Sequence, residues 1–222
     1  MAIDPQQVEQ HAVSRYTAAA RLNHWITAIS LILLALTGLS LFHPSLFWLT
    51  NLFGGGTITR ELHPWLGVIL FFSFCGLFFR FVSLNFWKPE DTDWMKNLGA
   101  VARAEDEKLP ELGKYNAGQK LVFWGMSLLI LVLITTGIAI WENRFGHLFS
   151  LDQKRLAVVI HAAAAIGAIT IWIVHVYTAI WVRGTIRAMT RGSVTAGWAF
   201  RHHRKWLREE ARKPAESTQK IG

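Results

Sequence analysis

The stretch Val158–Val182, "VVIHAAAAIGAITIWIVHVYTAIWV", contains no Asp, Glu, Lys or Arg. A spanning helix needs about 20 predominantly apolar residues, so this stretch is long enough to cross a membrane. It also contains His161 and His175. Ionisable side chains are costly in hydrocarbon and, where they occur, are candidates for function. The sequence therefore predicts a membrane helix with two functional rings.

Three other stretches, 22–59, 62–79 and 121–141, also lack charged residues. Hydrophobic residues make up 52% of the chain and charged residues 17%, against about 25% charged in soluble domains. The alternation expected of membrane β-strands is absent. We therefore predict an all-α membrane protein, a four-helix bundle forming a single domain over 1–222. The transmembrane helices are expected at about 24–43, 61–84, 118–141 and 155–183, followed by a basic tail over 184–222.

Basic residues predict the orientation. The loop 85–119 carries five Lys or Arg and the tail after Val182 carries ten, whereas the other two loops carry few. The positive-inside rule places that loop and both termini in the cytoplasm. The first 23 residues lack the apolar core of a cleavable signal, so the first helix is expected to remain in the protein. The basic tail is then a topology signal, and no nucleic-acid partner is expected.

Cysteine usage excludes several redox centres. Cys75 is the only cysteine of the chain. An iron–sulfur cluster needs about four cysteine ligands, and covalently attached haem needs C-x-x-C-H. No phosphate-binding loop, nucleophile elbow or H-E-x-x-H motif is present, and the "GGG" at 54–56 is interpreted as a turn.

The nine histidines fall into two groups. Five are interpreted as solvated, interfacial or loop residues: His11, His43, His147, His202 and His203. The remaining four lie in or beside the predicted spans: His24, His63, His161 and His175.

Depth in the membrane pairs these four histidines. His161 and His175 are fourteen residues apart, which is about 21 Å and just under four turns of one helix, so they share a face. By the predicted topology, His63 lies at the depth of His161, the outer pair, and His24 lies at the depth of His175, the inner pair. Two histidine pairs at two depths of a bundle are the pattern expected for two b-type haems, each with two axial histidines.

Alternative interpretations of these histidines are a metal site, a proton relay and helix packing. Zinc needs all its ligands within about 2 Å of one ion, which the separation along the fourth helix forbids. A proton-relaying transporter usually shows internal repeats, and none is found. Small residues near the histidines, such as Gly38, Gly67 and Ala162–Ala165, either leave room for a macrocycle or let helices approach closely.

The sequence resembles the gamma subunit, or cytochrome b subunit, of membrane-bound bacterial formate dehydrogenase, from about Arg15 to Trp206. The matching stretches are "HW" at 24–25, "LTGLSLFHP" at 36–44, "LHPWLG" at 62–67, "GKYNAGQK" at 113–120, "IHAAAAIG" at 160–167, "HVYTAIWVRGTIRAM" at 175–189 and "RHHRKW" at 201–206. The octapeptide is the most specific of these. The four histidines stand where that family has its haem ligands.

The resemblance implies a role in the inner membrane. In that family a molybdenum- or tungsten-pterin alpha subunit oxidises formate, and an iron–sulfur beta subunit carries the electrons to the membrane. The gamma subunit passes them through the outer and then the inner haem to a quinone, menaquinone or ubiquinone, reduced near the cytoplasmic face. No formate oxidation is expected on this chain itself.

The resemblance also implies that Asn116, Gly118 and Gln119 form the quinone site, where His175 can contact both haem and quinone. From the residues alone, Asn116 before an apolar run is better explained as an N-cap. Arg80 and Lys120, near the inner ends of the spans, either meet haem propionates or are ordinary basic residues of the membrane interface.

Two other functions fit the same pattern. One is the cytochrome b subunit of a nickel–iron hydrogenase or of a thiosulfate-type reductase complex, which would share the paired histidines. The other is a membrane anchor without redox function, in which the histidines serve only helix packing. The anchor would be colourless, whereas both cytochromes would show a haem spectrum.

Overall fold

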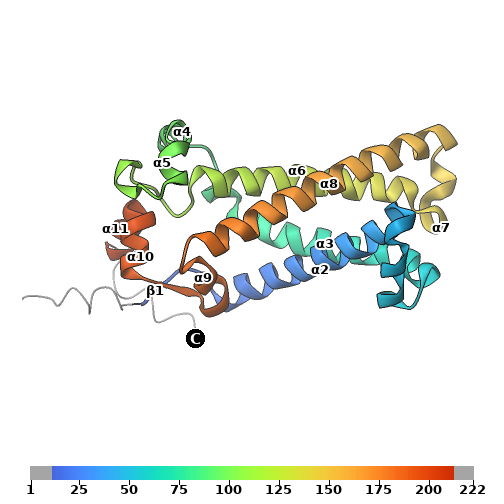
Figure 1. The fold of residues 1–222 in the computed structure, drawn as a ribbon, viewed down its shortest axis with the longest axis horizontal. Helices are drawn as coiled ribbons and strands as arrows, with labels where there is room; N and C mark the ends of the chain where they lie inside the picture. Colours follow the sequence, from blue (N-terminus) through green and yellow to red (C-terminus); the bar gives the residue numbers. More distant parts are fainter. Residues whose placement is uncertain (1–11, 213–222) are drawn as a thin grey trace, which may run out of the picture. The chain divides into compact units, whose positions relative to one another are not determined.

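The computed structural model describes residues 12–212, which are mainly helical (Figure 1). These residues form two compact units. Residues 18–82 and 122–178 make up the first, called here the membrane unit. The second, called the polar unit, consists of the other described residues. The predicted tail belongs to it up to residue 212, and residues 213–222 lie outside the described residues.

Four helices among the described residues are long and apolar enough to cross a membrane, which confirms the predicted fold class. They are α2 (Ala18–Phe42), α3 (Gly56–Phe81), α6 (Ala117–Ile140) and α8 (Leu151–Trp181). All four helices extend beyond the charge-free stretches. Helix α2 begins before Arg21, and α6 begins before Lys120. Helix α3 contains Arg60 and Arg80, and α8 begins before Lys154. Each residue of a growing helix adds a backbone hydrogen bond whether its side chain is apolar or charged. A helix can therefore continue past the membrane boundary, and charged residues mark that boundary better than the end of the helix does.

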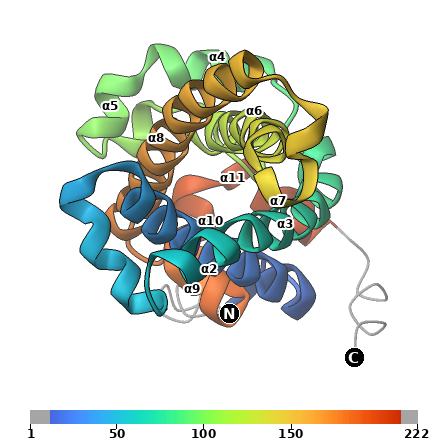
Figure 2. The same ribbon diagram turned by 90° about the vertical axis from the view of Figure 1, so that its right-hand side faces the viewer.

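In the membrane unit, α2 and α3 lie side by side, and α6 and α8 lie opposite them (Figures 1 and 2). The 3-10 helix η1 (Pro44–Phe53) connects α2 to α3 and ends at Gly54, whose φ of 87° is left-handed. Gly55 also has a positive φ, 99°. Gly54 and Gly55 therefore form the predicted turn, in a backbone conformation that other residues rarely adopt, and Gly56 begins α3. The loop before α8 contains α7 (Glu142–Phe145) and η4 (Gly146–Leu148).

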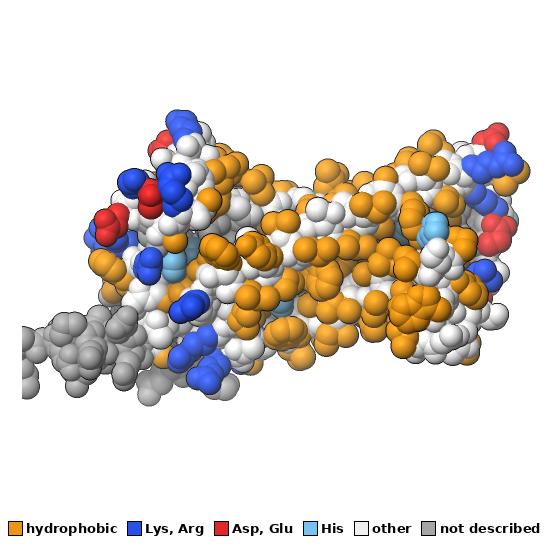
Figure 3. All heavy atoms as spheres, in the orientation of Figure 1, with side chains coloured by type: hydrophobic (Ala, Val, Ile, Leu, Met, Phe, Trp, Pro, Cys, Tyr) orange, Lys and Arg blue, Asp and Glu red, His pale blue; other side chains and the backbone are white. Residues whose placement is uncertain are grey.

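The core of the membrane unit is an apolar layer contributed by all four long helices. Leu31, Leu70 and Ile130 are buried in it, and Trp172 of α8 packs against them. On α2 this layer lies between His24 and Thr37. Outward-facing positions are also apolar, as at Phe72, and Figure 3 shows hydrophobic side chains over the long helices. Such a surface suits a lipid environment, where apolar side chains are stable on every face of a helix.

The polar unit contains short helices and one two-stranded antiparallel sheet. Strands β1 (Ala12–Ser14) and β2 (Ser193–Thr195) pair with Val13 opposite Val194. The helical segments are η2 (Val82–Leu84, which begins in the membrane unit), α4 (Pro89–Lys96), α5 (Leu98–Ala102), η3 (Asp106–Lys108), α9 (Thr185–Arg191), α10 (Ala196–His202) and α11 (Arg204–Ala211).

Two small apolar clusters stabilise the polar unit. One joins the first described strand to the C-terminal helices, with Val194, Ala199 and Trp206 buried and Val13 packed against them. The other cluster contains Trp94, Leu112 and Ala117. The described part of the predicted basic tail is therefore folded around its own apolar side chains.

Candidate functional site

The structure brings the four histidines together in the two predicted pairs. His63 of α3 and His161 of α8 have ring centroids 6.3 Å apart, with the ring planes at 67°. His24 of α2 and His175 of α8 have centroids 6.4 Å apart, at 52°. Helix α8 thus contributes one ring to each pair, because the fourteen-residue spacing keeps both of its histidines on one face.

The spacing within each pair fits one metal ion between the rings. Two imidazole nitrogens that bind a metal at about 2 Å each, from opposite sides, hold their ring centroids roughly 6 Å apart. Within residues 12–212, no group of three or more His, Cys, Asp or Glu side chains is arranged to hold a metal. A metal held by only two protein ligands must bring other ligands with it, and the four nitrogens of haem do so.

Two threonines that were not predicted as site residues contact the outer pair. Thr37 Oγ1 lies 2.7 Å from His63 Nδ1, and Thr136 Oγ1 lies 2.9 Å from His161 Nδ1. The sequence does contain a signal, because each threonine opens a Thr-Gly dipeptide in a charge-free stretch.

The glycine of each dipeptide lies against the same ring. A Cβ atom on Gly38 would be 3.3 Å from His63 Cε1, and one on Gly137 would be 3.5 Å from His161 Cε1. No Cβ contact of this kind occurs at Gly67, where nothing lies within 4 Å. The glycine beside each threonine therefore lets the imidazole ring approach the neighbouring helix.

The inner pair has a different environment. His24 Nδ1 is buried and has no hydrogen-bond partner in the described part of the chain. Beside it, Asn23 Nδ2 donates to Ser73 O at 2.7 Å, and Thr27 Oγ1 lies 2.7 Å from Ser73 Oγ. A Cβ on Gly76 would meet Asn23 Oδ1 at 2.7 Å, so that glycine allows α2 and α3 to approach. These polar groups link the two helices at the level of His24.

Asn116 and Gln119 form a capping box at the start of α6. Asn116 Oδ1 accepts from Gln119 N at 2.9 Å, and Gln119 Oε1 accepts from Asn116 N at 3.0 Å. The N-cap interpretation is thus confirmed. Because each oxygen is used in the cap, the amide nitrogens are the groups that could donate to a ligand. Gly118 lies close to Trp94, whose Cη2 would be 3.2 Å from an added Cβ.

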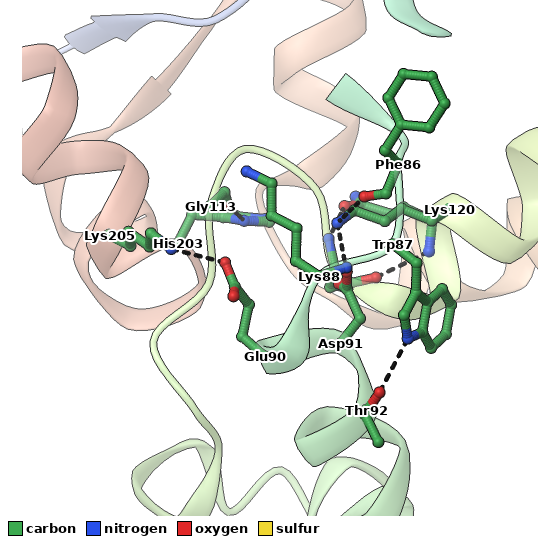
Figure 4. Close-up of polar contacts among 12 residues, drawn as sticks. Phe86, Trp87, Lys88, Glu90, Asp91, Thr92, Gly113, Lys120, His203 and Lys205 are labelled. Atoms are coloured by element: carbon green, nitrogen blue, oxygen red, sulfur yellow. Dashed lines mark hydrogen bonds and ion pairs between the residues drawn. The ribbon is translucent and has the colours of Figure 1, made fainter. Parts of the chain in front are cut away.

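Lys120, the next residue, forms a buried ion pair with Asp91 of α4. The Lys120 ammonium lies 2.5 Å from Asp91 Oδ2, and the two side chains are 3% and 0% exposed. Lys120 also donates to Phe86 O at 3.1 Å, and Asp91 Oδ2 accepts from Lys88 N at 2.7 Å (Figure 4). Lys120 therefore has a protein carboxylate as its counter-ion.

His203 is buried, so the prediction that it is solvated was wrong. Its ring lies 5.1 Å from that of Trp198, and its Nδ1 donates to Gly113 O at 2.7 Å. That bond leaves Nε2 as an acceptor, 3.4 Å from Arg15 Nη2. Burial lowers the pKa of His203 to about 3, with the Arg15 charge adding to the effect. The sequence signal for His203 was its place in the "RHHRKW" match.

Arg15 fixes the segment that leads into the capping box. It is 4% exposed and donates through Nη2 to Lys114 O. Its Cζ atom lies 5.1 Å from the ring centroid of Trp198 and 4.7 Å from that of Trp206. Arg15 and His203 together therefore hold the backbone of Gly113 and Lys114 by two hydrogen bonds.

Two of the remaining histidines, His43 and His202, contact residues close to them in the sequence. His43 accepts from Ser45 N and caps η1, and His147 lies in η4. The ring of His202 lies beside that of Trp198, with centroids 5.3 Å apart and the ring planes tilted at 57°. His11 lies outside the described residues.

A membrane bundle with facing histidine pairs, each spaced to hold one metal ion, is typical of one class of proteins, the membrane cytochromes of the b type. The family model described as "Prokaryotic cytochrome b561" matches residues 15–192, and the chain belongs to this family of transmembrane haem b electron-transfer proteins. Its four apolar helices and this family make it a multi-pass protein of the inner membrane.

Curated relatives narrow the family further. The chain is 42% identical to "Formate dehydrogenase, cytochrome b556(fdo) subunit" of Escherichia coli (strain K12), over 89% of this chain and 92% of the relative. It is 41% identical to the nitrate-inducible cytochrome b556(Fdn) subunit of the same organism, over 87% and 91%. It is 37% identical to the formate dehydrogenase cytochrome b556 subunit of Haemophilus influenzae, over 89% and 83%. The chain thus groups with the formate dehydrogenase cytochrome b subunits.

Proposed function

We propose that this chain is the cytochrome b subunit of a membrane-bound formate dehydrogenase and conducts electrons from an iron–sulfur subunit to a quinone. Formate itself is oxidised on a separate molybdenum- or tungsten-pterin subunit. The relatives, all formate dehydrogenase subunits by name, support the choice of complex. The observation that carries the redox role is the spacing of the two histidine pairs, 6.3 and 6.4 Å between ring centroids.

His63 and His161 would hold one haem b, and His24 and His175 the other. Haem b, when bound, supplies a one-electron couple between ferric and ferrous iron. The chain's own residues orient the ligands. Helix α8 carries one ligand of each pair, so its rotation about its own axis aims both rings at once. The apolar layer around Leu31, Leu70 and Ile130 keeps water out of the bundle between the pairs.

The quinone would bind at the start of α6, at the cytoplasmic end by the distribution of basic residues. The amide nitrogens of Asn116 and Gln119 can donate to a quinone carbonyl, and Gly118 is the third residue of this proposed site. Arg15 and His203 support this site because they hold the segment before it by Lys114 O and Gly113 O. Its position near the cytoplasm means that protons for quinone reduction come from that side.

Purification in mild detergent tests the complex. We expect the chain to co-purify with an iron–sulfur subunit and a pterin subunit, and formate to produce a reduced b-type spectrum. Mass spectrometry of the bound subunits and a difference spectrum are the measurements. Reduction by hydrogen gas but not by formate would support the hydrogenase alternative, and a colourless preparation would support the anchor.

Substitution of Gln119 tests the quinone site. In Gln119→Leu, loss of the amide donor should cost about 1 kcal/mol, a several-fold loss of quinone affinity. Gln119→Glu keeps an acceptor for Asn116 N, and hence the capping box, but removes the amide donor. Both variants should therefore keep their haems and turn over quinone more slowly in steady-state assays.

The pair of variants separates capping from binding. If Gln119→Leu is impaired but Gln119→Glu is not, the residue acts only as a cap. Proton uptake measured in oriented vesicles provides a second readout. Turnover should make the cytoplasmic side more alkaline, and uptake from the opposite side would contradict this placement of the site.

A further inference from the structure

The hydrogen bonds at the outer pair define which tautomer each histidine adopts. Thr37 Oγ1 donates its single hydrogen to Leu33 O at 2.8 Å, one turn back in α2. The same oxygen lies 2.7 Å from His63 Nδ1, so it must accept the Nδ1–H of that ring. Nε2 of His63 is then unprotonated, and its lone pair is available to a metal.

The second ligand repeats this arrangement on another helix. Thr136 Oγ1 donates to Val132 O at 2.6 Å and lies 2.9 Å from His161 Nδ1. His161 therefore also donates through Nδ1 and keeps Nε2 free for a metal. Both rings of the outer pair are thus oriented by a threonine whose own hydrogen is already used.

The inner pair lacks such bonds. His24 Nδ1 is buried without a hydrogen-bond partner in the part of the chain that the structure describes. No hydrogen bond from the ring of His175 to any other described residue is present either, although Thr178 Oγ1 donates to His175 O at 3.0 Å. The two pairs therefore differ in the hydrogen bonding of their ligands, although their ring spacings are nearly the same.

This difference has an electronic consequence. A ligand histidine that donates its other N–H to an acceptor becomes a more basic ligand. A more basic imidazole stabilises ferric iron, which carries the greater positive charge, more than it stabilises ferrous iron. Hydrogen bonding at Nδ1 therefore lowers the reduction potential of the metal, and second-shell bonding is one of the means by which proteins adjust haem potentials.

We propose that Thr37 and Thr136 are positioning residues that lower the potential of the haem held by His63 and His161 below that of the haem held by His24 and His175. Electron transfer from the first haem to the second is then downhill. The inference rests on the proposed haem ligation. It assigns the direction of flow to two hydroxyl groups that touch neither the haem iron nor the quinone.

Thr37→Val and Thr136→Val test this proposal because valine keeps the shape of threonine and removes the hydroxyl. Each substitution should raise the equilibrium constant for reduction of the haem held by His63 and His161 by roughly threefold to tenfold. At 59 mV per tenfold for one electron, its reduction potential should rise by about 30–60 mV. The other haem should keep its potential. Optical redox titration of the purified complex resolves the two potentials, and electron paramagnetic resonance of the ferric haems reports the change in ligand field.

Controls distinguish electronic effects from changes in packing. Thr135→Val is the matched control, because Thr135 donates to Leu131 O at 2.9 Å in the same helix turn and is exposed. It should leave both potentials unchanged. Thr37→Ser and Thr136→Ser keep the hydroxyl and remove only the methyl group. Their haem potentials should therefore lie closer to those of the parent protein than the potentials of the valine variants do. If a valine variant loses its haem, Thr→Ala and Thr→Ser at that position provide the comparison of potentials.

Three results would overturn the proposal. In the first, both valine variants retain two haems whose potentials are unchanged. In the second, a valine substitution shifts the potentials of both haems equally. In the third, the outer haem of the parent protein has a higher potential than the inner haem. Absence of haem from the parent protein is a different result, which contradicts the proposed function itself. The haem content by pyridine haemochrome assay therefore precedes the titrations.

Discussion

His63→Ala and His161→Ala are each expected to remove the same one of two b haems and to leave the other in place. The two ring centroids lie 6.3 Å apart and come from different helices, so loss of either ring would leave the proposed haem with a single histidine. His24→Ala and His175→Ala should each remove the other haem. The pyridine haemochrome assay should fall from two haems per chain to one, and the difference spectrum should lose one component.

Two other histidines serve as controls for this experiment. His43 caps η1, and His147 lies in η4. His43→Ala and His147→Ala should therefore retain both haems. Loss of a haem in His43→Ala with retention in His63→Ala would show that the pairing is wrong. A parent protein with one haem per chain would rule out a haem at each pair.

Lys120→Met is expected to destabilise the polar unit severely, by about 3–5 kcal/mol, because it leaves the Asp91 carboxylate buried without a cation. The two side chains are only 3% and 0% exposed. Asp91 also accepts from Lys88 N and so caps α4, which links this charge pair to the start of a helix. Denaturant or thermal unfolding of the purified protein, followed by circular dichroism, measures the loss.

The chain offers a matched exposed pair. Lys96 and Asp93 lie 3.3 Å apart in α4 with side chains 70% and 60% exposed, so Lys96→Met should cost only about 0–1 kcal/mol. The double variant Lys120→Met with Asp91→Asn should recover much of the loss, because no charge is then buried alone. Equal stability of Lys120→Met and Lys96→Met would refute the importance of the buried pair.

Much of the membrane unit could be predicted from the sequence. Charge-free stretches indicate spanning helices because charged side chains are costly in hydrocarbon, and these stretches lie within α2, α3, α6 and α8 or extend to the loops beside them. The pairing of the histidines followed from helix rise, since fourteen residues is nearly a whole number of turns, together with the helix directions that the basic residues predict. The structure brings the same pairs together.

The polar unit was much less predictable. His203 lies in a basic stretch, yet it is 2% exposed. Arg15, far away in the sequence, and Trp198, on the preceding helix α10, cover it. Asp91 and Lys120 are 29 residues apart and carry no local signal for pairing. The capping box at Asn116 and Gln119 was visible in outline because it depends only on residues three apart.

By itself, the sequence determined the number of spans and the relative depth of each histidine, because hydropathy and helix rise depend only on position along the chain. Its motifs also determined the family resemblance. Only the tertiary structure decided that Thr37 and Thr136 contact His63 and His161. Apolar residues cover nearly every face of these helices, so hydropathy does not show how each helix is rotated about its axis. Rotation determines which side chain meets a ring on the neighbouring helix, and packing between helices fixes it.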